Sequence, residues 1–158
     1  MRIVGIDPGT NAVGVAVLEN GKLIESYQIN LPHGKSLEDR LSALYCQLSH
    51  ITTYDADTIW VIEDGYVGPN PRTGLIVGMA RGLVIALACQ AGAPWKLIPP
   101  KSVKLTVCGR GDATKEQIQQ MVAAICKPGH KLGPDEADAI ATALAGWAMA
   151  KMEEQAHG

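Results

Sequence analysis

Four acidic residues are candidates for a metal site. Asp7 follows the apolar run RIVGI, and Glu63 ends another apolar run, TIWVIE. Asp135 and Asp138 are three residues apart in DEADAIATA, so on a helix they would share one face. Because like charges repel each other and a carboxylate is costly to bury, we expect a cation between these side chains. Hard oxygen ligands without a Cys or His cluster favour Mg²⁺ or Mn²⁺ over Zn²⁺.

Such a site is suited to phosphodiester hydrolysis, because two divalent ions about 4 Å apart can activate a water molecule and stabilise the leaving 3′ oxygen. We expect Asp7 to bridge the two ions, since a central strand would hold it rigidly, and the other three acids to complete the ligand shells. Simpler interpretations are Asp7 as a turn residue, Glu63 at the start of a solvated loop, and Asp135 as an acid that meets a helix dipole. The occurrence of all four acids in this order favours the metal site.

Basic residues are concentrated in the segment PKSVKLTVCGRGDATKEQ. We interpret them as a patch for contacts with a nucleic-acid backbone. Within it, Lys115 would bind the scissile phosphate or stabilise its transition-state charge, and the alternative is an ordinary solvated helix residue. The net charge of −2 does not exclude a nucleic-acid substrate, because setting four of the 16 acidic residues aside for metal leaves 12 against 14 basic ones, a balance of +2.

The elements that must position these residues follow from the hydrophobic pattern. The runs RIVGID, AVGVAVLEN and KLIESYQI predict an antiparallel meander, since NGK is a strong two-residue hairpin signal. The continuous run TIWVIE predicts a strand covered on both faces, and WKLIP predicts a short fifth strand. Helices are expected over residues 36–50, 73–90, 113–126 and 135–154. The pattern predicts an α/β fold with two of the acids at strand ends, where ligand sites of open sheets lie.

Composition narrows the class of protein. A length of 158 residues and an apolar fraction of 47% predict one globular domain over residues 1–158, with a short flexible tail after about residue 152. The N-terminus lacks a signal-peptide pattern and the run GLVIALACQAGAP is too short for a membrane span, so we expect a cytoplasmic protein with no membrane partner. The scattered cysteines lack a C-x-x-C pair and are interpreted as buried free thiols: Cys46, Cys89, Cys108 and Cys126.

Nearly the whole chain resembles the RuvC-type Holliday junction resolvases of the ribonuclease H-like superfamily. The resemblance is carried by GIDPGT, the strand-ending Glu63, ARG at residues 80–82, PKSVKLTVCGRGDATKEQIQQMV and DEADAIATA. It implies a five-stranded mixed sheet flanked by helices, in a homodimeric endonuclease that cuts four-way DNA junctions in recombination and repair. It also implies two Mg²⁺ ions for each active site, with Mn²⁺ as a substitute, and it admits a branch-migration complex as a further partner.

The same resemblance assigns the metal to the four acids and the junction contacts to Lys104 and Lys115, in the contexts VK and G-x-G-x-A-x-K. Tyr66, three residues after Glu63, falls at the position of an aromatic wedge between bases, which in the family is more typically Phe. The surrounding segment EDGYVGPNPRTG departs from the family pattern, so the preferred cleavage sequence does not carry over. The expected DNA-binding residues are Tyr66, Arg72, Lys101, Lys104, Arg110 and Lys115.

The helix expected over residues 73–90 is apolar nearly all round, which predicts burial on more than one side. Gly74, Gly78 and Gly82 recur every four residues and form a stripe that permits close approach of another helix. Packing on the chain's own sheet and packing in a dimer both fit this stripe. A two-fold dimer with two active sites suits a junction in which two strands must be cut, and this favours the dimer.

Three alternative functions fit parts of the sequence. The segment GIDPGTN also resembles the N-terminal hairpin of sugar kinases and actin-like ATPases, which need two lobes where this chain supplies one. A ribonuclease H-like nuclease acting on RNA or RNA–DNA hybrids would share the early strand that contains Asp7. A non-catalytic junction-binding protein would use the basic patch without the metal.

Overall fold

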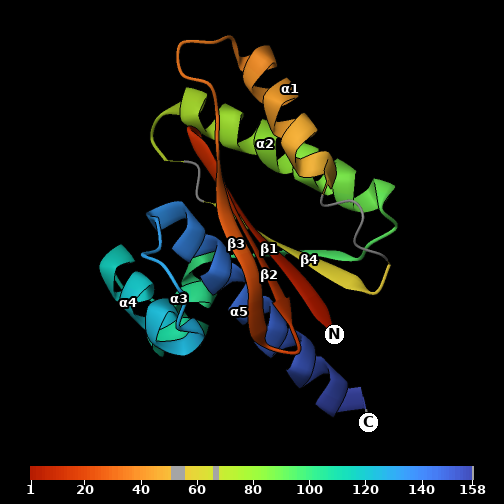
Figure 1. Cartoon of the computed structure of the whole chain (residues 1–158), viewed down its shortest axis with the longest axis vertical. Helices are drawn as coiled ribbons and strands as arrows, with labels where there is room; N and C mark the ends of the chain where they lie inside the picture. Colours follow the sequence, from red (N-terminus) through yellow and green to blue (C-terminus); the bar gives the residue numbers. More distant parts are fainter. Residues whose placement is uncertain (51–55, 66–67, 158) are drawn as a thin grey trace.

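The computed structural model describes residues 1–50, 56–65 and 68–157. Its centre is a five-stranded sheet with the strand order β3-β2-β1-β4-β5 (Figure 1). The first three strands form the predicted antiparallel meander, and β4 and β5 continue the sheet in parallel with β1. The mixed sheet flanked by helices confirms the predicted fold class. The strands are β1 (Arg2–Pro8), β2 (Ala12–Glu19), β3 (Lys22–Asn30), β4 (Thr58–Glu63) and β5 (Trp95–Ile98).

The hairpin between β2 and β3 forms where the sequence predicts it. Asn20 and Gly21 both have positive φ angles, 50° and 79°, as a two-residue turn that matches the strand twist requires. Gly21 is also needed for packing, because a Cβ at this position would lie 2.8 Å from the ring of Trp147. The tight turn keeps β3 in register beside β2.

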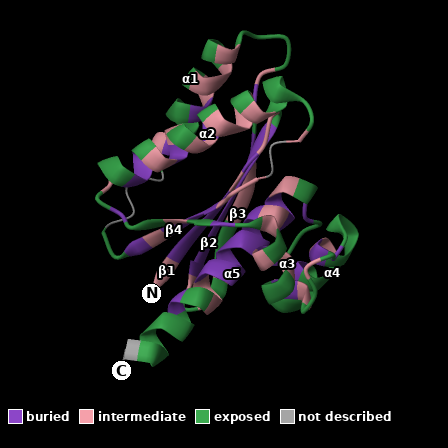
Figure 2. Cartoon of the chain, turned by 180° about the vertical axis from the view of Figure 1, so that it is seen from behind, coloured by how far each residue is buried: buried purple, intermediate pink, exposed green. Residues whose placement is uncertain are grey.

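Helices cover both faces of the sheet. On one face lies α5 (Pro134–His157), with α3 (Pro100–Cys108) and α4 (Lys115–Cys126) packed around it. On the other face lie α1 (Leu37–Leu48) and α2 (Pro71–Gln90). Figure 2 shows the buried residues gathered in the strands and in the part of α5 that crosses the sheet, while the C-terminal end of α5 is exposed.

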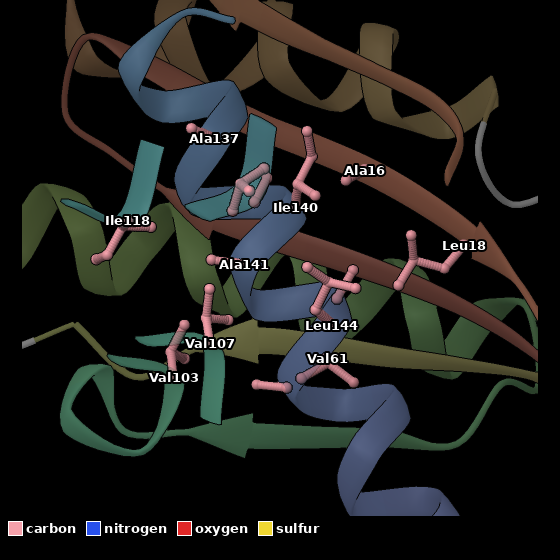
Figure 3. Close-up of a cluster of buried hydrophobic side chains, with 14 of the residues drawn as sticks. Ala16, Leu18, Val61, Val103, Val107, Ile118, Ala137, Ile140, Ala141 and Leu144 are labelled. Atoms are coloured by element: carbon pink, nitrogen blue, oxygen red, sulfur yellow. The ribbon is translucent and has the colours of Figure 1, made fainter. Parts of the chain in front are cut away.

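Two hydrophobic cores result, one on each face. Alternate residues of β4 divide between them: Val61 faces α5, whereas Trp60 and Ile62 face α1 and α2. Figure 3 shows the first core, in which Ile140 and Leu144 of α5 lie among side chains of the strands, α3 and α4. Burial on both faces explains why TIWVIE is continuously apolar.

The structure differs from the prediction at several helices. The segment after β5 forms α3, for which no helix was expected, and α2 begins at Pro71 rather than residue 73 because Asn70 caps it. The helix α5 continues to His157, although a short flexible tail was expected after about residue 152. Ion pairs within α5 and to β5 favour the extension: Lys151 Nζ lies 2.8 Å from Glu154, and Lys96 Nζ lies 2.6 Å from Glu153.

The cysteines are free, as expected, but they are not buried: Cys46 and Cys89 are exposed, and Cys108 and Cys126 are partly buried. Cys46 of α1 lines a pocket beside Leu83 of α2, and Cys89 lies near the C-terminal end of α2, so neither residue is enclosed by the core. The expectation of buried thiols is therefore wrong.

The expected burial of α2 on more than one side is also wrong within this chain. The buried residues lie on the side that packs against the sheet and α1; they are Ala80, Val84, Leu87 and Ala88. Leu75, in contrast, is 60% exposed. Because the helix begins at Pro71, it has 20 residues, and by length and composition it is the one helix in the described part of the chain that could cross a membrane. The sequence prediction considered only the run GLVIALACQAGAP, which begins at Gly82, and therefore gave the apolar segment too short a length.

Candidate active site

The four predicted acids gather at one end of the sheet. Asp7 is near the end of β1 and Glu63 is the last residue of β4, and the parallel pairing of these strands brings their carboxyl ends to the same edge. Asp135 and Asp138 lie in the first turns of α5, which crosses β1 and β2. Residues that are 128 or more positions apart along the chain thus meet at a single edge.

Close contact between α5 and β2 brings the helical acids to this edge. Gly14 is paired with Asp7 across the β1–β2 ladder. A Cβ on Gly14 would lie only 2.0 Å from the carbonyl oxygen of Asp135 and 3.0 Å from the Cβ of Ala139. Glycine at this position therefore lets the first turn of α5 approach the strand that neighbours Asp7.

A cleft of about 220 Å³ opens at the acidic edge. Its charged lining consists of three acids and two lysines, and its apolar lining comes from α3 and α4. The lysine Lys104 comes from α3, and Lys115 is the first residue of α4. The residues that line the cleft are Asp7, Glu63, Pro100, Val103, Lys104, Lys115, Ile118 and Asp138.

The electrostatics of the cleft disfavour ionised carboxyl groups in the absence of a cation. Burial raises the pKa of Asp7 to about 8, and the charges of Glu63, Asp138 and Asp135 raise it in the same direction. Burial and the charge of Asp138 likewise raise the pKa of Glu63 to about 7, and burial raises the pKa of Asp135. A divalent cation would replace the protons that Asp7 and Glu63 hold near neutral pH.

Lys115 supplies part of the missing positive charge. Its Nζ lies 3.1 Å from Oδ2 of Asp138, whose side chain is only 14% exposed, while the lysine side chain is 68% exposed. The charge of Asp138 raises the pKa of Lys115, so the ammonium form is favoured. Lys104 lies on the α3 side of the cleft, and its charge lowers the pKa of Glu63.

The structure does not bring the other predicted DNA-binding residues to the acids. Lys101 is exposed at the start of α3, and its alkyl chain lies over Gly111. Arg110 binds Asp112 through two hydrogen bonds of 2.7 and 2.8 Å and lines a separate cleft of about 280 Å³. Arg72 is exposed in the first turn of α2, and Tyr66 lies outside the described residues.

The carboxylates are neighbours but do not form a ready-made ligand cage. Among residues 1–50, 56–65 and 68–157, no three His, Cys, Asp or Glu side chains stand close enough together to hold a metal ion. The donor set nevertheless fits Mg²⁺ or Mn²⁺, because it consists of carboxylate oxygens whose raised pKa values reflect an uncompensated negative site. Ligation of one ion by three acids would require their side chains to move together.

Comparison with known proteins defines the family. The family model described as "Crossover junction endodeoxyribonuclease RuvC" matches residues 3–146. This chain belongs to the RuvC family. RuvC of Carboxydothermus hydrogenoformans is 39% identical over 153 residues, which cover 93% of this chain and 96% of the relative.

Solved RuvC structures have the same fold. The structure of Thermus thermophilus RuvC is 25% identical, with a TM-score of 0.81 and coverage of 97% of both chains. A second structure, of T. thermophilus RuvC in complex with a Holliday junction substrate, is 24% identical, with a TM-score of 0.83 and coverage of 96% of both chains. Membership of the RuvC family disfavours the alternative of a ribonuclease H-like enzyme that acts on RNA or hybrids.

Two features beside this RuvC-family cleft were missed in the sequence. Asp64 pairs with Arg81 of α2, and its N–H donates to the Ile98 carbonyl at 2.8 Å, so the chain is held immediately after Glu63. The segment ARG drew attention to Arg81 but not to its partner. Glu136 is buried and bound by three donors. No local sequence signal marks the contact between Glu136 and Ser26, because Ser26 is 110 residues away.

Proposed function

We propose that this protein resolves four-way DNA junctions by metal-dependent, symmetric hydrolysis of phosphodiester bonds in homologous recombination and DNA repair. The observation that carries the proposal is the cleft in which Asp7, Glu63 and Asp138 lie beside Lys104 and Lys115. Carboxylates suit divalent ions and the lysines suit a phosphate backbone, so both requirements of a nuclease meet in one place. The RuvC relative with a bound Holliday junction substrate supports a junction as the DNA structure.

The residues that would hold the metal are Asp7, Glu63, Asp135 and Asp138. Two bound Mg²⁺ ions, or Mn²⁺ in their place, would supply Lewis acidity toward the phosphate and a more acidic water nucleophile. Asp7 is the residue best placed to contact both ions, because its pKa responds to all three other acids. Membership of the RuvC family supports dependence on divalent metal in general.

The two lysines would orient the DNA backbone at the acids. Lys115 is exposed enough to exchange its contact with Asp138 for a phosphate oxygen, and its charge then lies beside the reacting phosphate. Lys104 approaches from α3, on the wall near Glu63. Lys101, Arg110, Arg72 and Tyr66 would contact the arms or the centre of the junction farther from the acids.

The homodimer is supported by the outer face of α2. A Cβ on Gly78 or on Gly82 would meet nothing within 4 Å in the described part of this chain, so the glycine stripe is not explained by packing on its own sheet. Leu75 and Met79 are 60% and 42% exposed on the same helix, and Gly74 is partly buried. Two copies of α2 packed about a two-fold axis would cover these apolar side chains and pair two active sites.

A cytoplasmic location and cooperation with a branch-migration complex belong to the same proposal. A branch-migration complex would deliver a junction to the nuclease before it is cut, and the cytoplasmic location stays a prediction from the sequence. Neither rests on a particular residue of the fold.

A cleavage panel tests the proposed function. Wild-type protein and Asp7→Asn are incubated with Mg²⁺ and with an immobile four-way junction, a duplex, a flap or an RNA–DNA hybrid. We expect the wild type to cut the junction at symmetric positions and the variant to bind it without cutting. Preference for the hybrid would support the RNA nuclease, and junction binding without any metal-dependent cleavage would support the non-catalytic protein.

A further inference from the structure

Glu136 is the only charged residue in the described part of the chain whose position is buried, with 7% of its surface exposed. It lies in the first turn of α5, directly after Asp135 and two residues before Asp138. Burial of an acid is costly unless its oxygens are bound by hydrogen-bond donors. The donors around Glu136 therefore indicate what the residue does.

Three donors from separate segments converge on the Glu136 carboxylate. The hydroxyl of Ser26 in β3 donates to Oε1 at 2.6 Å. Nε2 of His130, in the loop between α4 and α5, lies 2.9 Å from the same oxygen and donates to it, since a carboxylate can only accept. The backbone N–H of Gly133 donates to Oε2 at 3.3 Å. One side chain thus joins a strand, a loop and a helix.

The contact with Gly133 also caps α5. The carbonyl of Gly133 accepts a bond of 3.0 Å from the N–H of Ala137, which makes Gly133 the N-cap and Glu136 the third helical residue. A glutamate at that position that accepts from the N-cap N–H is half of a capping box. Glu136 therefore fixes both where α5 starts and how its first turn lies against β3.

Glu136 does not face the metal cleft. Successive side chains on a helix are rotated by about 100°, so Glu136 points away from the direction shared by Asp135 and Asp138. It is not among the residues that line the acidic cleft, and its oxygens are engaged by the three donors. Burial would raise its pKa, but the hydrogen bonds from Ser26 and His130 lower it, so the carboxylate form is favoured.

We propose that Glu136 is a positioning residue, which holds the first turn of α5 against β3 and the 127–133 loop and thereby sets where Asp138 stands in the cleft and where Asp135 stands beside Asp7. The inference rests on the proposed metal-dependent function. On the opposite side of the same turn, the backbone of Asp135 lies against Gly14 of β2. The first turn of α5 is therefore held by contacts with two strands, β3 and β2. Loss of either contact would move Asp135 and Asp138 away from Asp7.

A simpler account assigns Glu136 only a charge that attracts cations. The two accounts differ for Ser26→Ala, which removes the strongest neutral donor to Glu136 and leaves its charge in place. The positioning account expects Ser26→Ala to act in the same direction as Glu136→Ala. The charge account expects Ser26→Ala to behave like the wild type and Glu136→Gln to be as impaired as Glu136→Ala.

Two measurements on the full-length protein test the proposal. The first is amide hydrogen exchange of residues 137–140 without metal, and the second is Mn²⁺ affinity by electron paramagnetic resonance. We expect Glu136→Ala to speed exchange in this turn and to weaken Mn²⁺ binding, each by roughly tenfold, as loss of outer-shell support does. Glu136→Gln should recover part of both, because its amide oxygen still accepts from Ser26. Glu154→Ala, which removes an exposed ion pair of the same helix, is the matched control.

The outcomes separate this inference from the proposed function. Wild-type exchange and wild-type Mn²⁺ affinity in Ser26→Ala and Glu136→Ala would overturn the positioning role. A lower unfolding temperature with unchanged Mn²⁺ affinity would also overturn it, because the role would then be structural alone. If Glu136→Ala does not fold, Ser26→Ala decides. If the wild type binds no Mn²⁺, the metal-dependent function fails, while the exchange measurement still decides whether Glu136 holds the turn.

Discussion

Asp7 stands among three other carboxylates and close to one ammonium group. Burial is the largest cause of its raised pKa, and the charges of Glu63, Asp138 and Asp135 add to it, whereas Lys115 acts in the opposite direction. A residue in such surroundings is costly for the folded protein unless a cation binds there. An aspartate at this position is therefore explained by the binding of a cation.

Replacing Asp7 with Asn should separate stability from activity. We expect Asp7→Asn to lose cleavage of four-way junctions by more than the roughly 10–100-fold that is typical for an outer-shell partner of a metal. The metal-free variant should be at least as stable as the wild type, because a buried Asn is neutral at every pH and does not have to take up a proton on folding. Junction cleavage with Mg²⁺, junction binding and thermal unfolding without metal measure the three properties. Near-normal cleavage would contradict the metal assignment.

The raised pKa values predict how stability depends on pH. Asp7 and Glu63 have pKa values of about 8 and about 7 in the folded protein, whereas unfolded carboxyl groups titrate near pH 4. Between about pH 4 and pH 8 unfolding therefore releases protons, so the stability of the metal-free protein falls as the pH rises through this window. Thermal unfolding in chelator should show a smaller fall for Asp7→Asn, and Mg²⁺ should reverse the fall in the wild type. Parallel curves for the two proteins would disprove the shift at Asp7.

At the scale of elements, the site depends on how closely α5 meets the sheet. The strands that carry Asp7 and Glu63 were predictable, because hairpin chemistry and continuous apolar runs are local signals. The helix α3 was not, because it begins after Pro99 without a side-chain cap and no acid occupies its first turn. The roles of Gly14 and Glu136 were hidden as well, since each depends on a partner more than 100 residues away.

Adding one methyl group at Gly14 should disturb the site. The Cβ of Gly14→Ala would lie 2.0 Å from the carbonyl oxygen of Asp135, so the first turn of α5 must move away from Asp7. We expect a loss of stability of about 1–3 kcal/mol, as for other overpacked sites, and weaker Mn²⁺ binding. Gly129→Ala is the matched control, because a Cβ there meets nothing within 4 Å. Denaturant unfolding and Mn²⁺ titration measure both effects, and an unaffected Gly14→Ala would show that the turn tolerates displacement.

At the scale of the whole molecule, apolar side chains stay in contact with solvent on both sides of the sheet. On the α5 side, Leu105 of α3 and Ile125 of α4 are 57% and 50% exposed. On the other side, the exposed Leu75 and Met79 of α2 lie beside the glycine stripe, and this combination favours α2 as the helix that packs against a second copy. The apolar character of α2 and its glycine stripe were predictable from the sequence, but only the fold shows which side of the helix is left uncovered. Tyr66 lies outside the described residues, so its role as a base wedge stays a prediction.

Filling the glycine stripe should separate the two copies of a dimer. Gly78→Leu places a bulky side chain where the chain itself offers open space, so the domain should fold while close approach of a second α2 is blocked. We expect monomers in sedimentation velocity across a dilution series. A cruciform plasmid should then give nicked circles rather than linear product, since the two cuts become independent. Gly129→Leu serves as control, and a Gly78→Leu dimer that still gives linear product would refute this interface.

The contact between Lys115 and Asp138 has a consequence for the order in which ligands are accommodated. While the ammonium lies 3.1 Å from Oδ2, it competes with any cation for that oxygen. A phosphate that draws Lys115 away would free the carboxylate, so DNA and metal should each raise the affinity for the other, as thermodynamic reciprocity requires. We expect a junction to tighten Mn²⁺ binding by roughly fivefold or more in the wild type, which keeps Asp7. Lys115→Ala should abolish most of this coupling. Calcium, used to prevent cleavage, would allow the same comparison by calorimetry. Equal coupling in both proteins would mean that the lysine is a bystander. With such coupling, the metal binds tightly only after a DNA phosphate has drawn Lys115 away, so that in the absence of DNA the lysine itself neutralises Asp138.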